Sequence, residues 1–125
     1  MNAVWLLTTL LLCHYLADFC LTSPSMIRAK ANGRNVWPIL YHASVHALLM
    51  GLCLLIWGVT WKLLVLLALG ELISHFLIDT GKGRLTASIP LLTDQHKKPY
   101  WMLYGFDQFL HLLVIVAIWH YSGIL

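Results

Sequence analysis

Residues 63–82 read LLVLLALGELISHFLIDTGK, and this stretch decides the fold. Its first eight residues are apolar or Gly, and a Glu, a His and an Asp then follow one another at four-residue spacing. A helix of about 20 mostly apolar residues is long enough to cross the hydrocarbon core of a bilayer, and residues four apart lie on one helix face. The stretch therefore predicts a membrane-spanning helix that carries three ionisable side chains on one face.

The composition extends this prediction to the whole chain. Hydrophobic residues make up 60% of its 125 residues and charged residues only 10%, whereas soluble domains contain about 25% charged residues. A soluble protein of this size could not bury so much apolar surface. We therefore expect one all-α domain over 1–125, an integral membrane four-helix bundle with spans at 4–21, 38–59, 63–80 and 102–121.

The basic residues predict how the bundle is oriented. Seven of the eight Lys and Arg residues lie in the first and third predicted loops, and only Lys62 lies in the second. Basic loops stay in the cytoplasm, so we expect both termini outside and a multi-pass protein of the bacterial inner membrane. We expect the third helix to stop at Gly81 and Gly83, which open a loop that Pro99 closes. The net charge of +3 is too small and too scattered to indicate a nucleic-acid partner.

Ionisable side chains recur as pairs within the predicted spans. The two members of each pair are four residues apart: His14 and Asp18, His42 and His46, His75 and Asp79, Asp107 and His111, with Glu71 one turn before His75. Because successive spans run in opposite directions, the pairs align in two layers, about 5–6 Å apart, near the cytoplasmic side. Ionisable groups in hydrocarbon are costly unless they are paired, so this cluster is predicted to have a function.

Imidazole and carboxylate groups that project from facing helices are typical metal ligands in helical bundles. They indicate a divalent metal, with zinc favoured over iron and manganese. The predicted ligands are His14, Asp18, His42, His46, His75, Asp79, Asp107 and His111, and the predicted catalytic residues among them are Asp18, Asp79 and Asp107. A supporting or substrate-binding role is predicted for Glu71, Lys30, Lys82 and Gln108, although a plain loop charge is the favoured interpretation of the two lysines. Two alternatives stay open: a polar network that locks the helices together, and a proton or ion relay.

Several motifs together resemble a known family. They are HYLADF at 14–19, Met26-Ile27 with Lys30, His42-x-x-x-His46, His75-x-x-Ile78-Asp79-x-x-Lys82 and Asp107-Gln108-x-x-His111. As an ordered set, these motifs resemble domain-of-unknown-function family 3307, whose members are small integral membrane proteins. The resemblance implies a membrane location and this set of residues, but no activity. A looser similarity, of site type alone, is to membrane-bound metal-dependent hydrolases with His-rich helices.

These observations favour a metal-dependent integral membrane hydrolase that acts near the cytoplasmic headgroup layer. Membrane lipid is the expected partner, and the predicted substrate is an anionic lipid or an isoprenoid phosphate. One alternative is a proton or divalent-metal channel or transporter. It would need a homo-oligomer to form a pathway, and polar residues that continue to the outer face. The other alternative is a structural or interaction protein whose bundle is stapled by a metal, without catalysis.

Overall fold

The computed structural model describes residues 3–124, which are almost entirely helical. The elements in chain order are α1 (Ala3–Tyr15), the π-helical turn η1 (Leu16–Cys20), α2 (Pro24–Asn32), α3 (Val36–Ile56), α4 (Trp61–Ser88), the 3-10 turn η2 (Pro90–Thr93) and α5 (Lys98–Ile124). Four of them, counting α1 and η1 as one, are long and apolar enough to cross a membrane. Residues 3–124 contain no strand, so the prediction of an all-α chain with four long apolar helices is confirmed.

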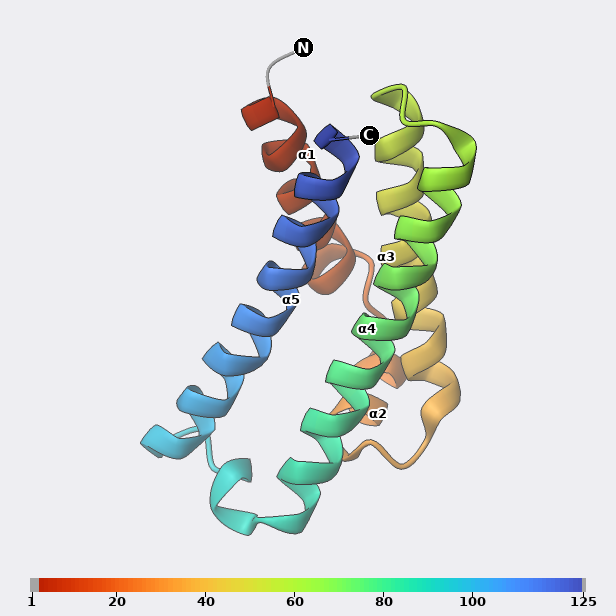
Figure 1. The fold of residues 1–125 in the computed structure, drawn as a ribbon. Helices are drawn as coiled ribbons and strands as arrows, with labels where there is room; N and C mark the ends of the chain where they lie inside the picture. Colours follow the sequence, from red (N-terminus) through yellow and green to blue (C-terminus); the bar gives the residue numbers. More distant parts are fainter. Residues whose placement is uncertain (1–2, 125) are drawn as a thin grey trace.

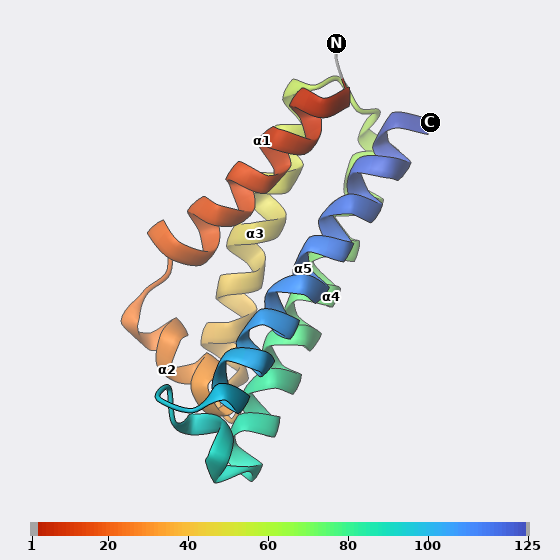
Figure 2. The same cartoon turned by 90° about the vertical axis from the view of Figure 1, so that its left-hand side faces the viewer.

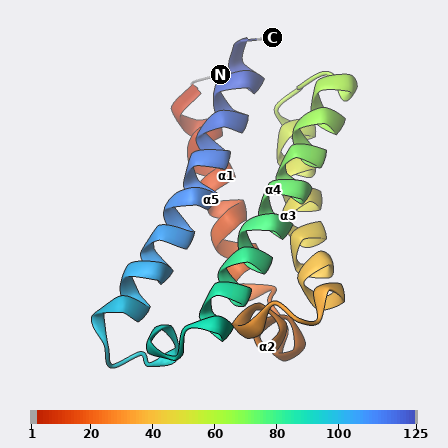
Figure 3. The ribbon, with the colours of Figure 1, turned by 60° about the horizontal axis from the view of Figure 1, so that its bottom comes forward.

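The four long helices pack as one bundle. α1 contacts α3 and α5, and α4 contacts the same two helices (Figure 1). The start of α1, the end of α5 and the α3–α4 turn lie together at one end of the bundle, which we call the terminal end (Figure 2). α2 and η2 lie at the opposite end, which we call the α2 end, where α2 packs against α3 and α4 (Figure 3).

Apolar side chains cover the outside of the bundle, while ionisable ones fill part of its interior. Leu48, Ile56 and Trp61 are 74%, 72% and 69% exposed. The ten largest fully buried side chains include three His, one Glu and one Asp. Charged residues in soluble proteins are almost never fully buried unless they are paired. The distribution is therefore the reverse of the one that water imposes on a globular domain.

The interior is divided along the bundle axis into an apolar part and a polar part. Near the terminal end, apolar side chains from all four long helices form one core cluster, made of Leu6, Leu10, Met50, Cys53, Leu54, Leu67, Ile115 and Ile118. The indole N–H of Trp119 donates to the carbonyl oxygen of Ala3 at 2.7 Å and ties α5 to the start of α1. The polar part follows toward the α2 end.

α4 does not stop where the sequence analysis expected. It continues through Gly81 and Gly83 to Ser88, so the prediction that these glycines open a loop is wrong. Position 83 needs a glycine because α2 packs closely against it. A Cβ atom on Gly83 would lie 2.6 Å from the backbone N of Gly33 and 2.6 Å from the carbonyl oxygen of Lys30. Gly83 is therefore the point where α2 approaches α4, and it does not break the helix.

α2 is a helix that the sequence analysis did not predict. Its first residue is Pro24, and the hydroxyl of Ser23 before it accepts a hydrogen bond from Met26 N–H at 3.3 Å, as an N-cap does. It ends at Gly33, whose φ of 66° lies in the left-handed region and whose N–H donates to Ala29 O at 2.8 Å. The Pro and Gly that indicate a loop are thus the start and end of a short helix.

Candidate metal centre

The polar cluster begins where α1 changes into η1. Residues 16–20 form a π-helical turn, in which Leu21 N–H donates to Leu16 O at 2.8 Å. The turn carries Asp18, which is 8% exposed and whose Oδ2 lies 3.5 Å from Nε2 of His14. Single π-helical turns next to α-helices occur frequently at functional sites. Asp18 thus enters the core from a locally distorted helix.

Asp18 connects this helix to both α3 and α4. Its Oδ1 lies 2.9 Å from Nε2 of His42 and 3.3 Å from Nε2 of His46, both on α3. The same oxygen lies 4.0 Å from Nε2 of His75 on α4. Histidines from the pairs of α1, α3 and α4 therefore meet around one carboxylate.

Four imidazole rings, one from each long helix, lie against one another. The ring centroids of His46 and His75 are 3.6 Å apart, and those of His75 and His111 are 4.1 Å apart. His14 lies 5.0 Å from His46 and 5.5 Å from His111. All four rings are buried. These four histidines form the predicted layer that lies one helical turn farther from the cytoplasmic side, and their rings lie against one another.

His75 lies at the centre of these rings. Its Nδ1 is 3.4 Å from Oε1 of Glu71, and its Nε2 is 3.3 Å from Oδ2 of Asp79. Neither ring nitrogen forms a hydrogen bond with any of the described residues, although both lie within ion-pair distance of a carboxylate. Buried polar atoms are normally hydrogen-bonded, so a buried imidazole that is paired with two carboxylates but hydrogen-bonded to neither could serve as a metal ligand.

α5 contributes Asp107, Gln108 and His111 to the cluster. Nε2 of His111 is 3.2 Å from Oδ1 of Asp79 and 3.5 Å from Oδ1 of Asp107. The amide of Gln108 donates to Oδ2 of Asp18 at 3.2 Å and to Oδ2 of Asp107 at 3.3 Å. Gln108 therefore orients carboxylates from two helices, a position that suits the supporting role predicted for it.

Three overlapping sets of buried side chains could hold a metal ion, and His75 belongs to all three. Within each set, one ligand atom per residue lies within 4.8 Å of the others; the sets are His14, His46, Glu71 and His75; Asp18, His42, His46 and His75; and His75, Asp79 and His111. Ligand atoms about 2.1 Å from a tetrahedral zinc ion lie about 3.4 Å from one another. The two nitrogen–oxygen distances at His75, 3.3 and 3.4 Å, are close to this spacing. Asp107 belongs to no such set in the described part of the chain and lies at the edge of the cluster.

The cluster contains more carboxylates than ammonium groups. Lys30 Nζ lies 3.3 Å from oxygens of both Asp18 and Asp79, and Lys82 Nζ lies 3.7 Å from Asp107. Burial acts to lower the pKa of Lys30, but the carboxylates of Asp79 and Asp18 outweigh it and raise this pKa, which keeps the ammonium charged. With Glu71, four buried carboxylates face two ammonium groups. Buried charge without a partner is destabilising, so the excess negative charge calls for protonated imidazoles, such as His75 and His111 beside these carboxylates, or for a bound cation.

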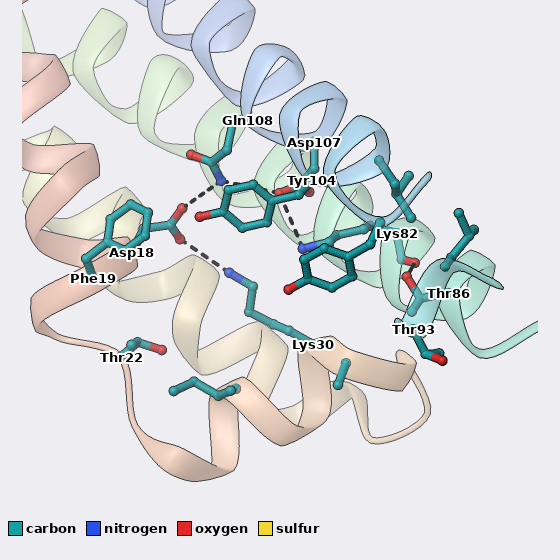
Figure 4. Close-up of a pocket in the computed structure, with 15 residues that line it drawn as sticks. Asp18, Phe19, Thr22, Lys30, Lys82, Thr86, Thr93, Tyr104, Asp107 and Gln108 are labelled. Atoms are coloured by element: carbon teal, nitrogen blue, oxygen red, sulfur yellow. Dashed lines mark hydrogen bonds and ion pairs between the residues drawn. The ribbon is translucent and has the colours of Figure 1, made fainter. Parts of the chain in front are cut away.

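A cavity of about 530 Å³ opens beside the cluster at the α2 end. Its polar side is formed by residues of the cluster and its lysines, namely Asp18, Lys30, Lys82, Asp107 and Gln108 (Figure 4). Its other walls are largely apolar or aromatic and include Phe19, Ile27, Leu92, Tyr100, Leu103 and Tyr104. A few converging polar groups in an apolar pocket are typical of small-molecule sites.

The structure brings together every side chain that the sequence analysis selected. The eight predicted ligands and Glu71 are buried, and Lys30, Lys82 and Gln108 lie between them and the cavity. The roles assigned to these residues stay predictions. The favoured interpretation of Lys30 and Lys82 as plain loop charges is wrong, because Lys30 lies on α2, Lys82 lies within α4, and both pair with buried acids.

Sequence reasoning did not find Tyr104, which lines the cavity. Its ring centroid lies 5.2 Å from Nζ of Lys82, a cation–π contact. Tyr104 precedes Asp107 by three residues and Gln108 by four, so helical spacing places it on the face that carries the cluster. That spacing was the signal that could have identified it.

The fold and the site together define a class: a bundle of four long apolar helices whose ionisable side chains are gathered inside, in an arrangement that could hold a metal. The chain belongs to the family described as "Protein of unknown function (DUF3307)", whose model matches residues 6–125. No curated protein and no solved structure matches the chain.

Proposed function

We propose that the chain is a metal-dependent hydrolase embedded in a membrane, with the metal held around His75 and the substrate in the adjacent cavity. One observation carries the proposal. His75 is fully buried, both of its ring nitrogens face carboxylates without forming a hydrogen bond, and all three candidate ligand sets share it.

Membrane insertion is supported by the apolar outer surface and by the distribution of charge. The α2 end carries Arg28, Lys30, Arg34, Lys82, Arg84, Lys97 and Lys98, whereas Lys62 lies at the terminal end. By the positive-inside rule, the α2 end would face the cytoplasm and both termini would lie outside. The membrane that we propose is the inner membrane of a bacterium. The 28 residues of α4 form a helix about 42 Å long, which exceeds the hydrocarbon core of about 30 Å. Its last turns and α2 then lie at headgroup depth, beside the cavity.

The ligand chemistry favours zinc, with iron and manganese as alternatives. Each set combines imidazole with carboxylate, a mixture that all three metals accept. The spacing at His75 is compatible with tetrahedral zinc, which is common in hydrolytic sites that keep one position open for water. Gln108 would orient the ligands, because its amide donates to Asp18. Glu71, a member of one candidate set, would orient His75 where the metal occupies another set.

The residues at the edge of the cavity supply the rest of a hydrolytic site. A bound divalent metal would lower the pKa of a water molecule and polarise the scissile bond. Asp107 lies at the boundary between the ligand sets and the cavity, where a general base is needed. Lys82 and Lys30 place positive charge on the same wall, while Ile27, Leu92 and other apolar residues suit an acyl or isoprenoid chain. An anionic lipid or isoprenoid phosphate is the substrate that this combination favours.

The metal is tested by elemental analysis of the protein purified in detergent. We expect about one or two equivalents of zinc, iron or manganese, lost in His75→Ala and retained in His120→Ala, which removes an exposed histidine on α5 outside the cluster. Equal metal content in both variants, or none in the wild type with the fold intact, would contradict the metal centre.

Hydrolysis is tested with vesicles that contain lipid or isoprenoid phosphates, by release of phosphate or headgroup. We expect activity that Asp107→Asn reduces strongly and Asp94→Asn does not, because Asp94 lies outside the cluster next to η2. Activity that survives both His75→Ala and Asp107→Asn would refute the proposed site.

The apolar cluster at the terminal end opposes the channel alternative. It contains side chains from all four long helices and separates the polar cluster from that end. A polar site that is closed at one end suits an enzyme better than a conduction pathway for ions. A measured flux of protons or metal ions across proteoliposome membranes would favour the channel or transporter over the enzyme. The salt bridges of the cluster keep open the alternative of a polar network that locks the helices together, which is the interpretation that an absent metal would leave.

A further inference from the structure

The ammonium group of Lys30 lies among three potential metal-ligating atoms from three helices. Nζ is 3.3 Å from Oδ1 of Asp18, 3.3 Å from Oδ2 of Asp79 and 3.2 Å from Nε2 of His42. All three partners are buried, with side chains that are at most 3% exposed. Lys30 itself comes from α2, outside the four long helices, and reaches inward to this position (Figure 4).

A metal and Lys30 compete for the same atoms. Asp18 and His42 form one candidate ligand set together with His46 and His75. An imidazole nitrogen has either one lone pair or one N–H, so Nε2 of His42 cannot bind a metal while it also contacts Lys30 or donates to Asp18. Two cations around one buried carboxylate also repel each other. Filling this subsite therefore requires that the ammonium leave.

We propose that Lys30 is a tethered cation whose ammonium blocks the metal subsite formed by Asp18, His42, His46 and His75, and that a divalent cation entering this subsite expels the lysine into the cavity. The proposal rests on the metal binding proposed above and extends it. Under this proposal, metal binding and anion binding are cooperative, because the expelled ammonium joins Lys82 on the wall of the cavity.

The surroundings of Lys30 permit this movement. Its side chain is 17% exposed and lines the cavity of about 530 Å³, so the ammonium has an aqueous destination within reach of its four-carbon stem. Lys82 also lines this cavity, beside Tyr104. Two ammonium groups at an apolar pocket are suited to a phosphate group on a hydrophobic chain.

Zinc titration of the EDTA-stripped protein in detergent tests the competition, with Lys30→Met compared with Lys82→Met. Both variants remove one positive charge, but Lys82 contacts Asp107, outside the candidate sets. An electrostatic gain is therefore present in both variants, and only Lys30→Met also frees atoms of a candidate ligand set. Lys30→Met should bind zinc at least about fivefold more tightly than Lys82→Met, or bind an additional equivalent, in the range of typical coupling between sites.

Acetylation of the wild-type protein gives a second measurement that needs no variant. Saturating zinc should raise the rate at which an amine reagent modifies Lys30, measured by mass spectrometry, while the rate at Lys62 stays constant as an internal reference. An unchanged Lys30 rate with saturating zinc, or equal zinc affinity in the two methionine variants, would overturn the proposal.

The two proposals fail in different ways. If zinc binding is present and depends on His75 but leaves Lys30 unaffected, the tethered-cation proposal fails and the metal centre stands. If the wild type and both lysine variants bind no zinc, the metal centre fails and this proposal fails with it.

Discussion

Replacing Gly83 with alanine should push α2 away from α4 and withdraw Lys30 from the core. The added Cβ would meet the backbone N of Gly33 and the backbone carbonyl oxygen of Lys30, each at 2.6 Å. This is 0.8 Å short of the 3.4 Å at which ordinary contact begins. Both obstacles are main-chain atoms, which cannot rotate away as a flexible side chain can. The helices must therefore separate by most of that distance.

The expected loss of stability follows from comparison with Gly81→Ala, two residues earlier in α4. A Cβ on Gly81 meets no atom within 4 Å among the described residues, so that variant should gain up to about 1 kcal/mol from helix propensity. Gly83→Ala has the same gain but adds the overpacking cost of about 1–3 kcal/mol. The difference between the two variants isolates the contact, and we expect Gly83→Ala to be less stable than Gly81→Ala by about 1–3 kcal/mol.

Reversible unfolding in mixed micelles, followed by circular dichroism, measures this difference. Acetylation of Lys30 should also be faster in Gly83→Ala than in Gly81→Ala, because α2 carries the lysine. If the two variants have equal free energies of unfolding, the close approach of α2 and α4 does not contribute to stability and the reasoning is refuted.

Three other measurements test the rest of the structure. Gln108→Leu should lower zinc affinity by about 10–100-fold, as the loss of a group that orients metal ligands does, and an affinity unchanged in a chelator-competition assay would contradict its hydrogen bonds to Asp18 and Asp107. Zinc at about 100 times its dissociation constant should stabilise the stripped protein by about 2.7 kcal/mol, and a melting temperature insensitive to zinc would oppose the metal centre. Trp119→Phe removes the hydrogen bond to Ala3, which should cost about 1 kcal/mol or less in unfolding and leave metal content unchanged; a loss of metal would mean that the two ends of the bundle are coupled.

The bundle and its polar interior could be predicted from the sequence because both depend on local periodicity. A long apolar run determines a long helix through its composition alone, and a four-residue spacing determines a shared face through the pitch of the helix. His75 and Asp79 lie on one stripe, meaning a row of side chains along one helix face, whichever residues pack against them. Once each of the four helices carries one such stripe, burial of the polar groups brings the stripes together.

α2 could not be predicted because its signals have two meanings. Ser23 and Pro24 are typical of a loop and equally of a helix start, and Gly33 is typical of a turn and equally of a helix end. Gly83 is ambiguous in the same way, since a glycine inside a helix marks either a weak point or a close approach. Only the partner helix distinguishes these meanings, and the partner lies 50 residues away in the chain.

The same dependence on a partner explains why Lys30 was interpreted as a loop charge. A helix of nine residues, such as α2, is too short to be stable alone, since isolated helices below about 12–15 residues are marginal in water. α2 is therefore held by its packing at Gly33 and Gly83 and by the ion pairs of Lys30 with Asp18 and Asp79. The insertion of the lysine and the docking of the helix are thus one structural event. A change that removes the ammonium from the core should also loosen α2, so the proposed entry of a metal would alter the packing of this helix at the surface of the bundle.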